Sequence, residues 1–309
     1  MAVKKLCVLW WISVSSWAQN QTEASPYFKS YNDQIILSTY LIDTSNSFEI
    51  IGQSSGTPAR LNLNPNRRTQ LGAQLSYRFV DISGGFSPKF FEENKDNSGS
   101  KLFSFNTRFY AQKWMQSFLF IYQKGFYISN NEREVGFPKF ASTKIGGTTS
   151  YVFNDRFSIR TLANQKQWQT KSAGSFIPSL SFYYTNLDLN DASNNPHSDI
   201  YTLTLTPSYY YNFAISHKFL IGLGLAAGAG LNWIDHDCSA LYEFSSNLKI
   251  GYNTDRFFTY LTGNSINFIQ NEQADIRLND QVSTVKFALG YRFDPPEKLK
   301  TFFDHLNKK

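Results

Sequence analysis

The sequence has no run of the roughly 18 to 20 consecutive apolar residues that a helix needs to cross a bilayer. Charged residues are also scarce, at 17% of the 309 residues, whereas a soluble surface carries about 25 to 35% charge. Aromatic residues make up an equal share, 17%, which argues against a disordered chain. Helical membrane proteins and disordered chains are therefore excluded, and a large β-structure with alternating apolar and polar residues fits these averages.

Cysteine is nearly absent, with only Cys7 and Cys238 in the chain. Cys7 falls in the segment interpreted below as a cleaved signal, so the mature chain can form no intrachain disulfide. There is also no Pro/Ser linker and no low-complexity tract between residues 30 and 293, which predicts one folded domain. The predicted organisation is a signal peptide at 1–18, an N-terminal periplasmic segment at 19–33, a β-barrel at 34–293 and a C-terminal periplasmic tail at 294–309.

Residues 1–18 have the form of a secretory signal peptide. Lys4 and Lys5 precede the short apolar segment from Leu6 to Val14, and Ser16-Trp17-Ala18 fits a small-x-small cleavage site. We therefore expect export through a cleaved signal peptide.

Alternation of apolar and polar residues with period two is the dominant pattern, as in strands with one apolar face. Over 219–233 one face is Phe, Ile, Leu, Ala and Trp, and the other is almost entirely Gly, Ala and Asn. Similar alternation recurs at 71–79, 103–109, 201–213, 242–252 and 285–293. Two structures fit this pattern: a soluble sandwich or barrel with its apolar face inward, and an outer-membrane barrel with its apolar face toward lipid.

Strand length and connections favour the membrane barrel. The predicted strands often run for about 11 to 15 residues, against about 5 to 6 in globular proteins. Aromatics gather at strand ends, as in an interfacial girdle. Short turns at 154–155, 216–217 and 254–255 contrast with longer loops at 92–100, 188–199 and 270–280. We predict an all-β, antiparallel transmembrane barrel of about 12 strands (10–14) in the outer membrane of a Gram-negative cell.

The last predicted strand resembles an outer-membrane assembly signal, because residues 286–293 follow the polar-x-Gly-x-x-aromatic-x-aromatic pattern with Ala288 in place of the glycine. The barrel-assembly machinery is therefore an expected partner through Lys286–Phe293, together with outer-membrane lipid. Beyond the strand, Leu299, Phe302, Phe303 and Leu306 follow helical spacing. This spacing predicts a short amphipathic helix on the membrane surface or across the periplasmic mouth; a disordered tail is the alternative.

Four stretches resemble segments of a Bacteroidota outer-membrane family known as domain of unknown function 4421. They are Leu63-Asn64-Pro65-Asn66 with Leu71-Gly72, Tyr31-Asn32-Asp33 with Tyr40, residues 122–127, and residues 171–176. The resemblance implies an outer-membrane barrel and implies no activity. It singles out as motif residues Asn66, Gly72, Lys124, Gly125, Ser172 and Gly174.

Lys124 breaks the pattern of its predicted strand. The alternation of Phe118, Phe120, Tyr122, Lys124 and Phe126 places a charge on the lipid face. Such a charge costs about 2 to 4 kcal/mol at the bilayer midplane and little near an interface. We therefore predict a β-bulge at Gln123–Gly125, or a position close to a rim.

The predicted lumen is basic. Seven basic residues are assigned to the non-lipid face, against Glu243: Arg78, Arg108, Lys144, Arg160, Lys249, Lys286 and Arg292. An excess of positive charge favours anions in a channel or pocket. The other interpretation is that these groups pair with loop acids or fill a narrow lumen.

The function hypothesis is a non-enzymatic barrel that passes or binds small anionic solutes. It needs no cofactor, metal or nucleic acid. One alternative is a lipid-modifying outer-membrane enzyme that uses His197 and His236 of the outer loops. The other is an adhesion or assembly partner that acts through those loops.

Overall fold

The computed structural model describes residues 25–54, 57–65, 69–78, 80–91, 101–130, 133–163, 165–188, 197–234, 237–270 and 277–306. The predicted signal peptide at 1–18 and the motif residue Asn66 lie outside these residues. Within the described ranges, no helix is both long enough and apolar enough to cross a membrane.

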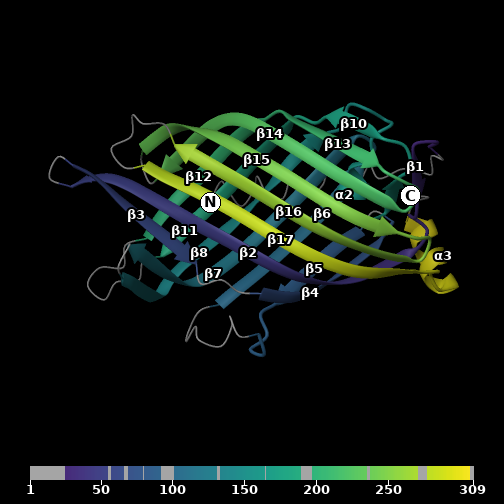
Figure 1. Ribbon diagram of the computed structural model, residues 1–309, viewed down its shortest axis with the longest axis horizontal. Coiled ribbons are helices and arrows are strands. Elements are labelled where there is room, and N and C mark those ends of the chain that lie inside the picture. The colour runs from purple at the N-terminus through teal and green to yellow at the C-terminus, as the bar shows by residue number, and fades with distance from the viewer. Residues whose placement is uncertain are drawn as a thin grey trace.

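Twelve antiparallel strand positions close into a ring, and the predicted fold is confirmed (Figure 1). Three positions are made of two pieces each: β3 with β4, β10 with β11, and β12 with β13. The ring closes where β17 pairs with β2. The wall strands are β2 (Ile35–Ser54), β3 (Thr57–Pro65), β4 (Thr69–Tyr77), β5 (Val80–Phe86), β6 (Lys101–Ala111), β7 (Trp114–Asn130), β8 (Arg133–Tyr151), β10 (Ala173–Phe176), β11 (Ser179–Asp188), β12 (His197–Thr206), β13 (Ser208–Ala214), β14 (Phe219–Ile234), β15 (Asp237–Asn253), β16 (Phe257–Gln270) and β17 (Arg277–Phe293).

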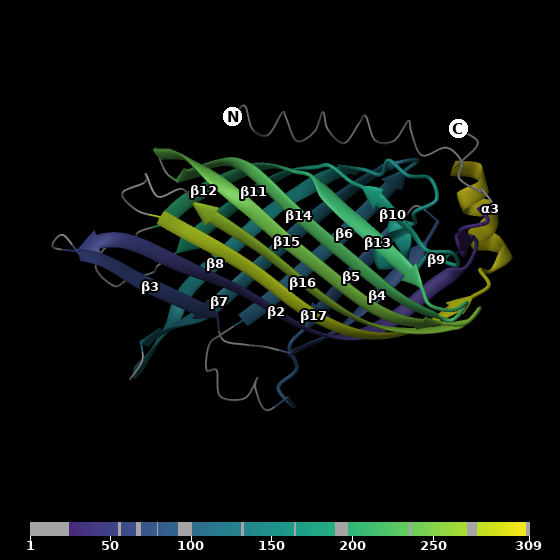
Figure 2. The same ribbon diagram turned by 45° about the horizontal axis from the view of Figure 1, so that its top comes forward.

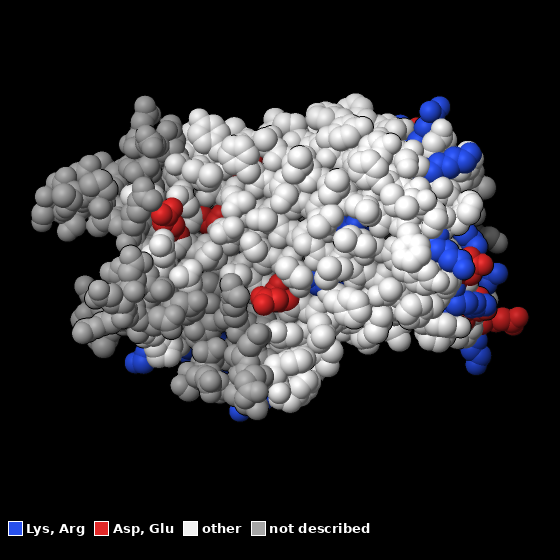
Figure 3. Space-filling model, viewed as in Figure 1, with Lys and Arg blue, Asp and Glu red and all other residues white. Residues whose placement is uncertain are grey.

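The outward face of the wall is apolar. Along β17, Val285, Phe287 and Leu289 are each 44 to 56% exposed, and their neighbour Ala288 on the other face is fully buried. In Figure 3 the middle of the wall carries few charges, whereas Lys and Arg gather at one end. Because a soluble surface would not expose such a band, the outer face has the character of a lipid-facing surface.

The two ends of the barrel differ in their connections. Only a few residues join β6 to β7, β13 to β14 and β15 to β16 at one end. That end also carries β1 (Phe28–Ser30), β9 (Gln167–Gln169) and the C-terminal helix α3 (Glu297–Leu306) (Figures 1 and 2). The first and the last described elements of the chain, β1 and α3, therefore lie at the same end, and we refer to it as the periplasmic end.

The predicted β-bulge is present in β7. The pairing register shifts between Lys124 and Phe126, and Gly125 between them has a φ of 87°, which favours glycine. The extra residue reverses the alternation. Phe126 therefore faces inward, only 1% exposed, and its predicted place on the lipid face is wrong.

A segment between β8 and β10 enters the barrel, where the sequence predicted a simple turn at 154–155. Residues 154–172 contain α2 (Ile159–Ala163) and β9, and β9 pairs with β1. We call this segment with β1 the plug. Trp168 of β9 is 1% exposed and packs with Tyr31, Leu220 and Phe258. The prediction that Arg160 lies on a wall strand is also wrong, because Arg160 belongs to α2.

Candidate functional site in the barrel interior

The interior has three layers, and we treat it as the candidate site. An apolar layer lies toward the outer end, a half-buried polar layer lies in the middle, and the plug fills the periplasmic end. The seven predicted basic residues are distributed over all three layers, and they do not form one continuous lining.

Aromatic and aliphatic side chains form the outer layer. Phe126 packs edge-on against Phe140 with ring centroids 4.5 Å apart, and it contacts Phe48 at 6.2 Å. Leu63, Leu187 and Ile200 complete this cluster. Alternation assigned apolar side chains to lipid, and it did not predict an apolar cluster inside the barrel.

One ion pair crosses the barrel at this level. Lys144 of β8 pairs with Asp280 of β17, and these strands are six positions apart in either direction around the ring. Lys144 is 3% exposed, and its ammonium lies 5.5 Å from the ring of Phe268. The predicted inward direction of Lys144 holds, and its side chain bridges opposite walls.

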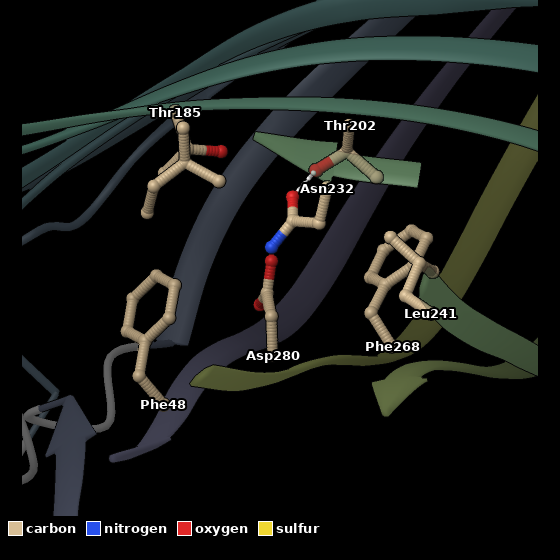
Figure 4. Close-up of a pocket in the computed structure, with 8 residues that line it drawn as sticks. Phe48, Thr185, Thr202, Asn232, Leu241, Phe268 and Asp280 are labelled. Atoms are coloured by element: carbon tan, nitrogen blue, oxygen red, sulfur yellow. Dashed lines mark hydrogen bonds between the residues drawn. The ribbon is translucent and has the colours of Figure 1, made fainter. Parts of the chain in front are cut away.

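A small cavity of about 10 Å³ adjoins this ion pair. In Figure 4 the Asn232 amide and the Asp280 carboxylate point toward one another near the rings of Phe48 and Phe268. Asn232 accepts a hydrogen bond from Thr202 at 2.7 Å. The second carboxylate oxygen of Asp280 has no hydrogen-bond partner among the described residues.

The middle layer holds two half-buried cations, Arg108 of β6 and Lys286 of β17. Lys286 lies 3.9 Å from the ring of Tyr40 and donates to the Gln74 side chain at 3.2 Å. Arg108 is within electrostatic range of Lys286. Within the described part of the chain, Arg108 makes no hydrogen bond, and neither cation forms an ion pair.

The carboxylates of the interior are already engaged. Glu243 accepts hydrogen bonds from Thr204 and Thr206 at 2.6 and 2.7 Å. Asp81 accepts from Gln74 and Ser76 at 2.8 and 2.7 Å. These donors are neutral, so both carboxylates keep their charge, and Asp81 lies within electrostatic range of Lys286. Neither carboxylate accepts a hydrogen bond from Arg108 or Lys286, so both cations still have donors to offer an anion.

Two predicted lumen cations hold the plug. Lys249 donates to the backbone carbonyls of Thr161 and Leu162 at 2.7 and 3.0 Å, at the end of α2. Arg292 donates to the carbonyl of Gln165 at 3.0 Å, and its guanidinium lies 3.7 Å from the Tyr31 ring. Both cations are fully buried. They donate to plug carbonyls that lie outside β9 and therefore have no partner in a sheet.

The periplasmic turn after β4 joins the plug to α3. Arg78 accepts a hydrogen bond from Lys166 at its carbonyl, at 2.7 Å, and its guanidinium pairs with Asp304 of α3 at 2.5 Å. Phe303 packs edge-on against Tyr77 at 5.0 Å. The predicted C-terminal helix is present and lies against the periplasmic rim.

Packing or backbone geometry explains most of the family-like motif residues. A Cβ on Gly72 would lie 2.2 Å from the Tyr40 ring, and one on Gly174 would lie 2.5 Å from the Tyr209 hydroxyl. Ser172 accepts a hydrogen bond from the Ala214 amide at 3.0 Å. Close packing of tyrosines and the β7 bulge at Lys124 and Gly125 account for these positions without assigning them chemistry.

The histidines of the enzyme alternative do not form a site in the described residues. His197 is exposed at the start of β12, and His236 lies outside the described ranges. Among the described residues, no three His, Cys, Asp or Glu side chains are grouped as metal ligands.

The chain belongs to the family described as Domain of unknown function (DUF4421), whose profile matches residues 23–293. No curated protein matches it. Among solved structures it is similar to OmpT of Vibrio cholerae, at 8% identity over 87% of this chain and 100% of that one, with a TM-score of 0.30. It is also similar to an outer-membrane channel of Pseudomonas putida F1, at 10% identity, 88% and 100% coverage and a TM-score of 0.39. The P. putida toluene transporter TodX matches at 8% identity, 85% and 90% coverage and a TM-score of 0.31. Scores this low define no common strand arrangement, so the fold rests on the strand pairing of this chain.

Proposed function

We propose that this protein is an outer-membrane barrel that binds a small anionic solute in its middle layer and is closed at rest. Its proposed location is the outer membrane, reached through a cleaved signal peptide and the assembly machinery that reads Lys286–Phe293. In this proposal the protein is not an enzyme, and it binds its solute with side chains of the barrel interior.

The middle-layer cations carry the proposal. Arg108 and Lys286 come from different strands, lie within electrostatic range of one another and donate no hydrogen bond to the interior carboxylates, which accept from neutral side chains. A guanidinium and an ammonium in a partly desolvated layer attract carboxylate, phosphate or sulfate groups more strongly than in water. The plug below and the apolar layer above separate this layer from bulk solvent.

Ion selectivity in planar bilayers tests the proposal. Wild-type protein is expected to show no stable opening at low voltage, whereas Lys249→Met with Phe126→Ala weakens the plug and the apolar layer and yields openings selective for anions in a KCl gradient. Adding Arg108→Gln and Lys286→Gln to that double variant is expected to abolish the selectivity. Cation-selective openings, or selectivity unchanged by the two glutamines, would contradict the proposal.

A further inference from the structure

A second, separate cleft lies at the periplasmic mouth, between the plug and the β6–β7 turn. It has a volume of about 80 Å³. Phe28 of β1 and Phe157 of the plug line it with Trp114, which begins β7 and is half exposed. Polar side chains, among them Lys113 and Asp155, line the rest, so the walls of the cleft are mixed, and the cleft adjoins the rim of the lipid-facing surface.

Arg160 contributes the charge of this cleft. Its side chain comes from α2, and the residue is only 9% exposed. One guanidinium nitrogen lies 3.4 Å from the Asn32 amide oxygen, and the guanidinium lies 5.0 Å from the ring of Tyr110. In the described ranges no carboxylate pairs with Arg160, since the nearby Asp155 pairs with Lys113 at 2.9 Å. Burial lowers the pKa of Arg160, and Tyr110 offsets only part of this effect.

Tyr110 supplies a second donor. Its residue is 7% exposed, and its hydroxyl has no hydrogen-bond partner in the described part of the chain. A buried hydroxyl without a partner is unfavourable, so a bound acceptor at this position would supply the missing hydrogen bond.

We propose that this cleft binds an anion, with the Arg160 guanidinium and the Tyr110 hydroxyl donating to a phosphate or carboxylate group. Both side chains offer donors, and a guanidinium matches the paired oxygens of such groups. Burial of Arg160 and Tyr110 strengthens the attraction, because little water reaches either side chain. Two sources share this chemistry: a free periplasmic anion and the headgroup of an anionic phospholipid in the inner leaflet.

Isothermal titration calorimetry on the full-length protein in non-ionic detergent tests the proposal. The probes are inorganic phosphate, dihexanoyl phosphatidic acid below its micelle concentration, and dihexanoyl glycerol as the uncharged comparison. Wild type is expected to bind at least one of the two anions saturably and the glyceride at least tenfold more weakly. Arg160→Gln should weaken anion binding at least tenfold, and Tyr110→Phe about threefold.

Arg156→Gln is the matched control, because Arg156 is an exposed arginine of the same segment and should leave affinity unchanged. Binding of both anions supports a free anion, and binding of phosphatidic acid alone supports a lipid headgroup. Equal affinity in Arg160→Gln and Arg156→Gln, or no saturable anion binding, overturns the proposal. If Arg160→Gln does not fold, Arg160→Lys and Tyr110→Phe test the proposal instead. Unchanged affinity for the anions in both variants overturns the proposal. Repeating the titrations in the Arg108→Gln, Lys286→Gln background removes phosphate bound in the middle layer, so a remaining effect of Arg160→Gln belongs to the cleft.

Discussion

The barrel is closed at both ends, by the apolar layer at the outer end and by the plug at the periplasmic end, and the two closures differ in structure. The outer closure consists of wall side chains, mainly Phe48, Phe126 and Phe140, beside the ion pair between Lys144 and Asp280. The periplasmic closure consists of a chain segment, whose backbone carbonyls need donors once they leave water. Lys249 and Arg292 supply those donors. A buried cation of the outer closure therefore pairs with a carboxylate, whereas those of the periplasmic closure bind backbone carbonyls.

The largest expected effect concerns packing in the periplasmic closure. Trp168→Ala removes a fully buried ring and leaves a cavity among Tyr31, Leu220 and Phe258, so the free energy of unfolding should fall by about 3 to 5 kcal/mol. Denaturant titration in lipid vesicles measures this. Trp233→Ala, a half-buried tryptophan of β14, is the control and should cost clearly less. Equal losses would show that the plug is not a packed core.

The ion pair of the outer closure comes next. Lys144→Met leaves the Asp280 carboxylate without its cation, which should cost about 3 kcal/mol of unfolding free energy. The double variant Lys144→Met with Asp280→Leu should recover most of that loss, because it removes both charges. The same denaturant titration checks both, and a double variant as unstable as the single one would argue against a cross-barrel pair.

A smaller effect tests the contact between wall and plug. A Cβ on Gly251 would lie 3.1 Å from the Trp168 ring, whereas one on Gly263 would meet nothing within 4 Å. Gly251→Val should therefore overpack the interface and cost about 1 to 3 kcal/mol. Gly263→Val should change stability by less than about 0.5 kcal/mol. Thermal loss of the heat-modifiable band on gels ranks the two, and equal shifts would contradict the contact.

The smallest effect is at the edge of the plug. Lys29 of β1 donates to Asp255 at 2.6 Å, which lowers the pKa of that carboxyl below its usual value of 3.8. The pair therefore stabilises β1 above pH 3.8 and loses this effect as the pH falls through the lowered pKa. Because both groups are exposed, the contribution is below about 1 kcal/mol. Asp255→Asn should flatten the acid limb of the stability profile, and an unchanged limb would contradict the pair.

The wall could be predicted from the sequence, because successive side chains of a strand point to opposite faces whichever strand lies beside it. That regularity, with the even strand number of outer-membrane barrels, predicted about 12 strands within a range of 10 to 14, and the exception at Lys124 predicted the bulge at Gly125. It also placed Lys249 and Arg292 inward, without predicting their partners, because those carbonyls belong to a segment with no period. The plug left one signal in the sequence, the small inward face of β14, where Leu162 now packs against Gly222.

The position of β1 has a consequence for assembly. It pairs with β9 in the plug. Four residues separate β1 from β2, which pairs with β17 where the ring closes. The same short stretch of chain therefore takes part in two closing events, so we expect the ring to seal only after the plug is inside. Slower appearance of the heat-modifiable form after deletion of residues 19–30 would support this order, and an unchanged rate would contradict it. On this order, every barrel in which β2 has paired with β17 already contains its plug.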